Sequence, residues 1–429
     1  KPARHPLGGS ADGPVGRGVG MSLATGLIDA QVHDAAAMRC APAPLLQLAL
    51  MDARNRTLGW LSAFDGLQFS SAFDGFDPPW WLAGHAGWMQ EWWVARNLQR
   101  GRGEASDPAA TRLPSVLTQA DALFDPARTS RHKRWLVNAP ADSVLRQYLA
   151  DTLDTTLDLL DKAGTDDAAL HVYRHALHHE DRLGEQLAVL VQALDLAPER
   201  QQALAERGLW PALPGRARRE PLVLGGQRFL LGSPAAGWVP AEERWAHEVQ
   251  VPEFEIDVQP VCWSQFAEFV DDGGYDDRRW WTPAGWDQLE ASGRRAPRYV
   301  EQVSGGVLAR RGGRLQRLPG AQAVLHVSAH EAEAWCRWAG RRLPSEAEWE
   351  LAATLAGARG FAWGEVAEWV AGSARAYPGG PAWPDAADGT RVQRGASAWG
   401  SLRLRHPRAR QAVAGARDEG FVGFRSCAV

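Results

Sequence analysis

The first half of the chain places apolar residues at the spacing of amphipathic helices. Four segments show this pattern, at residues 44–64, 79 to about 100–103, 142–164 and 166–194. The third segment is the most regular, with one stripe of leucines at Leu145, Leu149, Leu153, Leu157 and Leu160. We expect Asp142 or Ser143 to cap this helix and Gly164 to lie just past its end. Four amphipathic helices with longer connections predict a helix bundle, a fold that builds metal sites from inward-facing side chains.

Beyond residue 220 the pattern changes. Short β-like runs at 229–231 and 249–251 alternate with Gly, Pro and Trp, and one clear helix is expected at about 329–338. Prolines and an arginine-rich stretch separate the two halves and predict a linker. The predicted fold class is therefore α+β multidomain. We expect a disordered tail and lead-in at 1–40, the bundle at 41–197, the linker at 198–220 and an α+β domain at 221–429.

Composition narrows the class of partner. The net charge of the 429-residue chain is −4 and its pI is near 6.3, so no basic footprint for nucleic acid or an anionic membrane is present. No run approaches the ~18 apolar residues of a membrane span, and the first twenty residues lack the apolar segment of a secretory signal. The four cysteines are scattered without a CxxC spacing, which we interpret as reduced thiols. We expect a cytoplasmic protein that acts on small molecules.

Three histidines are the candidate chemistry of the bundle. His175 and His179 lie four residues apart, so on a helix they project from one face and can hold one metal ion. His85, in the tryptophan-rich second segment, can supply a third ligand from another helix. Three imidazoles leave coordination positions open, and the metals that favour imidazole are iron, zinc, copper and nickel. His171 lies one turn before His175, so the spacing alone also allows those two to pair.

The second half carries ordered sequence motifs. The strongest are Trp-Ala-Gly-Arg-Arg-Leu-Pro-Ser-Glu at 338–346, Gly-Glu-Val-Ala-Glu-Trp at 364–369 and Gly-Phe-Arg at 423–425. With these motifs the region resembles the formylglycine-generating-enzyme-like (sulfatase-modifying-factor) domain, a variant of the C-type-lectin-like fold. Formylglycine-generating enzymes work through a pair of cysteines near the C-terminus. Only Cys427 lies there in this chain, so that activity is not expected.

The histidine motifs extend the resemblance to the first half. His85 lies in Trp-Leu-Ala-Gly-His, and His175-x3-His179 is followed by Asp181. These motifs are similar to those of the DinB-like four-helix bundle that precedes the sulfatase-modifying domain in ergothioneine-type sulfoxide synthases. The resemblance implies one Fe(II) held by His85, His175 and His179. It puts His178 near the substrate imidazole, where the family has glutamine, and Asp181 beside the metal site, where glutamate is usual.

Two segments bear on the substrates. Arg128 and Arg131 resemble an Arg-x-x-Arg segment that binds the carboxylates of the thiol donor, a role that suits the planar guanidinium; a solvated charge cluster is the alternative. Where the family has Asn-Trp-Asp and an arginine to bind the amino-acid betaine, this chain offers Gln411 and Arg417. These departures favour the selenoneine synthase branch, whose substrates are hercynine, a selenosugar and O2. No catalytic acid is assigned, because Tyr377 resembles a structural tyrosine of the fold.

Three alternatives remain open at this stage. The first is an ergothioneine-type sulfoxide synthase with a thiol donor. The second is a metal-dependent thiol transferase, which would consume no oxygen. The third is a non-catalytic lectin-like binding protein, whose ligand binding would survive loss of all three histidines.

Overall fold

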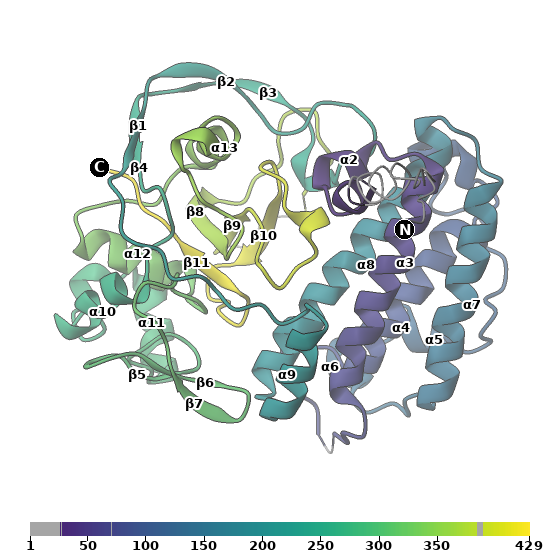
Figure 1. The fold of residues 1–429 in the computed structure, drawn as a ribbon, viewed down its shortest axis with the longest axis horizontal. Helices are drawn as coiled ribbons and strands as arrows, with labels where there is room; N and C mark the ends of the chain where they lie inside the picture. Colours follow the sequence, from purple (N-terminus) through teal and green to yellow (C-terminus); the bar gives the residue numbers. More distant parts are fainter. Residues whose placement is uncertain (1–25, 27, 70, 384–388) are drawn as a thin grey trace, which may run out of the picture.

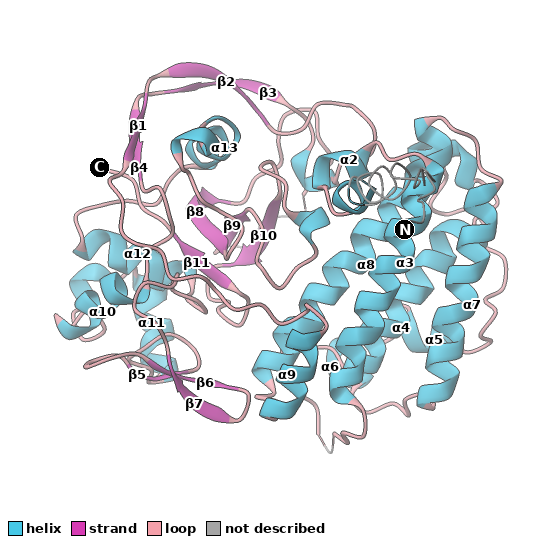
Figure 2. Cartoon of the chain, in the orientation of Figure 1, coloured by secondary structure: helices cyan, strands magenta, loops and turns pink. Residues whose placement is uncertain are grey.

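The computed structural model describes residues 26, 28–69, 71–383 and 389–429. The tail expected at the N-terminus lies mostly outside these residues. Long helices gather on one side of the molecule, and a region of short strands, short helices and loops lies on the other side (Figures 1 and 2). No helix among the described residues is long and apolar enough to cross a membrane.

Four long helices form the bundle. They are α3 (Ala43–Leu61), α4 (Pro79–Gln90), α7 (Asp142–Asp161) and α8 (Asp167–Ala193). Helix α8 packs against α3 and α4, and α7 packs against the same two helices. The four expected helical segments therefore all form. That the bundle is of the DinB-like type stays a prediction.

The ends of two bundle helices differ in how they are capped. Asp166 caps α8, because its side chain accepts a hydrogen bond from the amide of Ala169. Helix α7 already begins at Asp142. Its capping position is Ala141, which forms no side-chain capping hydrogen bond. The expectation that Asp142 or Ser143 caps α7 is therefore wrong. Asp142 lies in the first turn instead, where its charge favours the helix dipole.

Shorter helical elements surround the bundle. They are α2 (Ala35–Arg39), η1 (Ser62–Phe64), the π-helical η2 (Glu91–Ala95), η3 (Arg100–Ala105), α5 (Ala120–Phe124), α6 (Arg131–Arg134) and α9 (Pro198–Glu206). Helix α2 lies in the range expected as a lead-in, and α9 lies in the range expected as a linker.

The second half contains four small sheets among the described residues. They are β1 (Leu222–Leu224) with β4 (Phe254–Ile256); β2 (Gln227–Leu231) with β3 (His247–Val251); β5 (Val300–Gln302), β6 (Leu308–Arg311) and β7 (Arg314–Arg317); and β8 (Ala367–Ser373), β9 (Thr390–Arg394), β10 (Arg410–Ala414) and β11 (Val422–Phe424). The last sheet has the order β10-β9-β8-β11, with β11 parallel to β8. Both expected β-like runs are strands, and Phe229 is paired with Val249 across β2 and β3.

Helices of the second half are more numerous than the sequence pattern indicated. They are α10 (Trp263–Asp271), α11 (Pro283–Ser292), α12 (Ala329–Trp338), α13 (Glu346–Leu355) and the 3-10 turns η4 (Ala241–Glu243), η5 (Arg278–Trp280), η6 (Gly357–Arg359) and η7 (Leu402–Leu404). The expectation of one clear helix is therefore wrong, although α12 has the expected bounds. Helices of nine or ten residues give too few turns for a reliable periodic signal.

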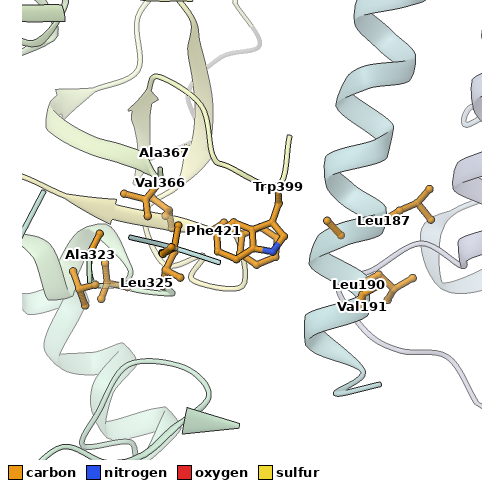
Figure 3. Packing of buried hydrophobic residues seen from close by; sticks show 14 of the residues in the cluster. Leu187, Leu190, Val191, Ala323, Leu325, Val366, Ala367, Trp399 and Phe421 are labelled. Carbon is orange, nitrogen blue, oxygen red and sulfur yellow. The ribbon is translucent and has the colours of Figure 1, made fainter. Parts of the chain in front are cut away.

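One hydrophobic cluster joins the two halves. Leu187, Leu190 and Val191 on α8 belong to the same buried cluster as Trp399 and Phe421 of the second half. The Trp399 and Phe421 rings stack with centroids 3.9 Å apart, and Figure 3 shows them projecting toward α8. Trp238 of the second half contacts the rings of His175 and His178, so the second half also lies beside the face of α8 that carries the histidines.

Candidate active site

His85 is fixed by its surroundings on α4. Its Nδ1 lies 2.9 Å from the carbonyl oxygen of Phe124, and its ring stacks on Trp81 and Trp88 with centroids 4.5 and 5.6 Å away. Gly84 makes this arrangement possible, because a Cβ at that position would overlap the Phe124 ring. The hydrogen bond at Nδ1 leaves Nε2 as the nitrogen available for a metal.

His175 and His179 project from neighbouring turns of α8. The ring centroid of His179 lies 5.2 Å from that of His85, on the facing helix. The Nε2 atom of His179 is buried and has no hydrogen-bond partner within the part of the chain that the structure describes. His175 contacts the edge of Trp93 at a centroid distance of 5.1 Å. A buried, unpartnered imidazole nitrogen is costly unless something binds it, and a metal ion is one such ligand.

Burial keeps these imidazoles neutral. Loss of hydration lowers the pKa of His85 and of His175 to about 4 and the pKa of His179 to about 3. Burial also lowers the pKa of His171, and it lowers the pKa of His178 well below the usual range. The neutral imidazole is the form that binds metals, so metal binding by these residues would require no deprotonation at pH 7.

The donor set fits a transition metal, although the side chains are not yet gathered around one. Among the residues that the structure describes, no group of three His, Cys, Asp or Glu side chains is arranged so that it could hold a metal ion. His85, His175 and His179 would therefore have to come closer together to bind one ion. The free Nε2 of His179 and the oriented ring of His85 are compatible with that movement.

The two supporting residues have different environments. His178 packs against Trp238 at a centroid distance of 4.8 Å and faces a cavity. Asp181 is buried and accepts two hydrogen bonds of 2.7 Å from Arg403 of the second half, and its described hydrogen bonds include none to a histidine. The resemblance alone did not indicate this ion pair, because the partner lies more than 200 residues away in the sequence.

A large cavity opens on the histidine face of α8. Its volume is about 550 Å³, and we call it the histidine cavity. The residues that line it include His171, His175, His178, His179, Arg182, Trp93, Trp238 and Glu242. The cavity is large enough for an amino-acid-sized molecule, and it borders two of the three proposed metal ligands.

A second cavity of about 470 Å³ lies between the bundle and the second half, and we call it the interdomain cavity. Arg131, Gln411 and Arg417, three of the four expected substrate residues, line it together. Arg131 lies 3.2 Å from the carboxylate of Asp77, and Arg417 forms an ion pair with Glu419. Both carboxylates also line the cavity, so they partly neutralise the two arginines.

Arg128 does not line either cavity. Its side chain is 60% exposed, and it lies 3.4 Å from Asp125, three residues earlier. This placement matches the solvated charge cluster that the sequence left open as an alternative.

Sequence reasoning missed two residues of these cavities. Arg182 and Gln186 line both of them, one and two turns beyond His178 on α8. The i, i+4, i+8 spacing from His178 was the available signal, because such residues share one helix face.

Comparisons with known proteins cover both halves of the chain. A family model described as "Sulfatase-modifying factor enzyme 1-like domain" matches residues 212–365, which confirms the resemblance of the second half. Hercynine oxygenase of Mycolicibacterium smegmatis is 35% identical over 349 residues, covering 80% of this chain and 73% of that protein. Hercynine oxygenase of Mycobacterium tuberculosis is 33% identical over 334 residues, covering 77% and 72%. Formylglycine-generating enzyme of Streptomyces coelicolor is 36% identical over a shorter stretch of 185 residues, covering 38% and 55%.

Proposed function

Because the chain belongs to the hercynine oxygenase family, we propose that it is an oxygenase that joins a chalcogen atom to an imidazole carbon of hercynine. The observation that carries this proposal is the neutral imidazole of His179, which faces the oriented ring of His85 and has a buried Nε2 with no hydrogen-bond partner among the described residues. A metal held by His85 and His179 would lie beside the histidine cavity, where substrates have room to bind it.

His85, His175 and His179 would hold the metal, which we propose is iron(II). When bound, iron supplies open coordination positions and the redox chemistry that O2 activation requires. The protein's own contribution is to hold the two organic substrates next to each other, which replaces a collision of separate molecules with reaction between neighbours. Trp81 and Trp88 cover the His85 ring and exclude water from it.

The overall reaction balances with O2 as the oxidant. The imidazole loses its C–H hydrogen, the donor loses its S–H or Se–H hydrogen, and a carbon–chalcogen bond forms. One oxygen atom is added to the chalcogen, and the second leaves as water with the two hydrogens. No external reductant is needed for this stoichiometry.

We further propose a selenosugar as the donor. The interdomain cavity is lined by three amides, Gln186, Gln393 and Gln411, which both donate and accept hydrogen bonds and so suit hydroxyl groups. The resemblance assigned Gln411 and Arg417 to the betaine, and we propose instead that they line the donor's cavity, because they share it with Arg131. Arg131 and Arg417 already have carboxylate partners, and a dicarboxylate donor would have to compete with these partners. A neutral, hydroxyl-rich donor avoids that competition.

The test is reconstitution with iron(II) without oxygen, followed by aerobic turnover of hercynine with three donors. These are a 1-selenosugar, the corresponding 1-thiosugar and γ-glutamylcysteine, with products measured by mass spectrometry and oxygen uptake by electrode. We expect the selenosugar to react fastest and γ-glutamylcysteine to react poorly. Comparable turnover with γ-glutamylcysteine would instead support an ergothioneine-type enzyme with a thiol donor. Absence of product and of oxygen uptake with every donor would contradict the proposed function.

A further inference from the structure

Arg182 is a half-buried cation on α8 that faces open space. Among the residues that the structure describes, its guanidinium makes no hydrogen bond and no ion pair, although it lines both large cavities. Two other arginines of the bundle have carboxylate partners: Arg174 contacts Asp167 at 2.7 Å, and Arg54 contacts Glu180 at 2.8 Å. A cation removed from much of its water favours an anionic partner, and here the open space supplies room for one.

The histidine cavity also contains an opposite charge. Glu242 is half-buried at the edge of this cavity, and its carboxylate has no hydrogen bond or ion pair within the described ranges. The Trp238 ring faces the same space, between His175 and His178. One free cation, one free carboxylate and an aromatic face in one cavity are complementary to a zwitterion.

We propose that Arg182 binds the carboxylate of the imidazole substrate in the histidine cavity and thereby selects an amino-acid betaine. The proposal rests on the proposed function and adds to it a residue that determines specificity. Hercynine carries a carboxylate, which suits the forked guanidinium, and a trimethylammonium group, which has no N–H to donate. The latter is best recognised by an aromatic face and a nearby negative charge, as Trp238 and Glu242 supply.

The geometry of α8 supports this assignment. Arg182 lies four residues after His178 and three after His179, so the three side chains project over neighbouring turns of one helix. A carboxylate bound to Arg182 would hold the attached imidazole toward the metal ligands. The neutral, hydroxyl-rich donor proposed for the interdomain cavity needs no cation there, which leaves Arg182 available to a carboxylate in the histidine cavity.

The experiment compares hercynine with its methyl ester, which keeps the imidazole and the trimethylammonium group but has no negative charge. Binding to the iron-loaded wild type, Arg182→Gln and Arg182→Lys is measured by calorimetry, and KM and kcat are measured for the same proteins. Arg228→Gln is the matched control, because Arg228 is 77% exposed on β2 and forms a 3.6 Å ion pair with Glu248, which is also exposed. Iron content and thermal midpoint report whether each variant is folded.

We expect the wild type to bind hercynine about 10- to 100-fold more tightly than the ester, as is usual for a charge-assisted contact. Arg182→Gln should lose this preference, and Arg182→Lys should retain part of it. Arg228→Gln should behave as the wild type does. If the wild type binds hercynine and its methyl ester equally tightly, the proposal is overturned whatever the variants do. If Arg182→Gln raises the KM for the donor but leaves the KM for hercynine unchanged, the proposal about Arg182 is also overturned. If the wild type does not bind hercynine at all, the proposed function itself is rejected.

Discussion

His179 is the residue on which the proposed metal site depends most. Its Nε2 is buried without a hydrogen-bond partner in the described ranges, and its ring lies next to that of His85. We expect His179→Ala to lose most bound iron, because two imidazoles hold a metal ion much more weakly than three. His171 lies two turns away on the same helix, so His171→Ala should bind iron as the wild type does. Elemental analysis after iron loading and desalting measures the iron content of both variants. Full iron content in the His179→Ala protein would remove His179 from the ligand set.

Buried histidines outside the site make stability depend on pH. Burial, with a smaller contribution from Arg311, lowers the pKa of His326 to about 3. The unfolded chain binds a proton at this residue below its ordinary pKa of about 6.5, while the folded protein does not until about pH 3. This residue therefore does not change stability above about pH 6.5, and it reduces stability progressively as the pH falls below that value.

His326→Asn tests this linkage. Asparagine tolerates the left-handed backbone of this position, where φ is +61°, and it does not titrate. The variant should be less stable than the wild type at pH 7, because the smaller side chain leaves a cavity. Its thermal midpoint should nevertheless fall less steeply between pH 7 and pH 4.5. Parallel curves for the two proteins would show that protonation of His326 in the unfolded chain does not contribute.

Sequence reasoning identified site residues where one short motif contains them. The spacing of His175 and His179 was enough to predict a shared helix face, and the structure has both on α8. Asp181 was assigned beside the metal, but its carboxylate is bound to Arg403, and no local pattern links residues so far apart. Arg182 was missed because a lone arginine on a helix is usually solvated. Its significance depends on cavities that only the folded chain creates.

At the scale of elements, the close approach of α4 and α5 determines how His85 is held. Gly84 faces the fully buried ring of Phe124, and the carbonyl oxygen of Phe124 accepts a hydrogen bond of 2.9 Å from Nδ1 of His85. In the sequence, Gly84 is only the residue before His85 in the Trp-Leu-Ala-Gly-His motif. The structure gives it a physical role, since a larger residue would separate the two helices.

Gly84→Ala should therefore reduce both stability and metal affinity. The added methyl group overlaps the Phe124 ring, and such overpacking typically costs about 1–3 kcal/mol. Displacement of Phe124 also removes the contact that orients His85. Gly101→Ala is the control, because no atom lies within 4 Å of a Cβ built there. Chemical denaturation and iron titration measure the two effects, and an unchanged iron affinity would show that Phe124 does not position His85.

Element prediction succeeded where the pattern was long and failed where it was short. Helices α7 and α8 have 20 and 27 residues, so their apolar stripes repeat over many turns. The second half combines strands of three to seven residues with short helices, and its packing comes from contacts between distant segments. Local periodicity carries little information about such a region, and the motif resemblance supplied its fold instead.

At the scale of the whole molecule, the two halves share one core and several buried ion pairs. Arg403 is 2% exposed and contacts Asp181 on α8 and Asp52 on α3, each at 2.7 Å. Arg39 contacts Glu243 with two bonds of 2.7 Å in the same interface. Breaking such a pair leaves an uncompensated buried charge, which strongly opposes separation of the halves.

We therefore expect the chain to unfold in one cooperative transition, whereas proteins of two independent domains commonly show two. Trp399→Ala removes a buried ring that stacks on Phe421 and belongs to the cluster shared with α8, so it should destabilise the protein by about 3–5 kcal/mol. The single transition should move to lower temperature as a whole, because the two halves lose the same contact. Leu98→Ala, at a side chain 69% exposed, is the control and should leave the midpoint nearly unchanged. Differential scanning calorimetry measures the unfolding of both variants. If only one part of the Trp399→Ala protein melts at a lower temperature, the two halves fold independently.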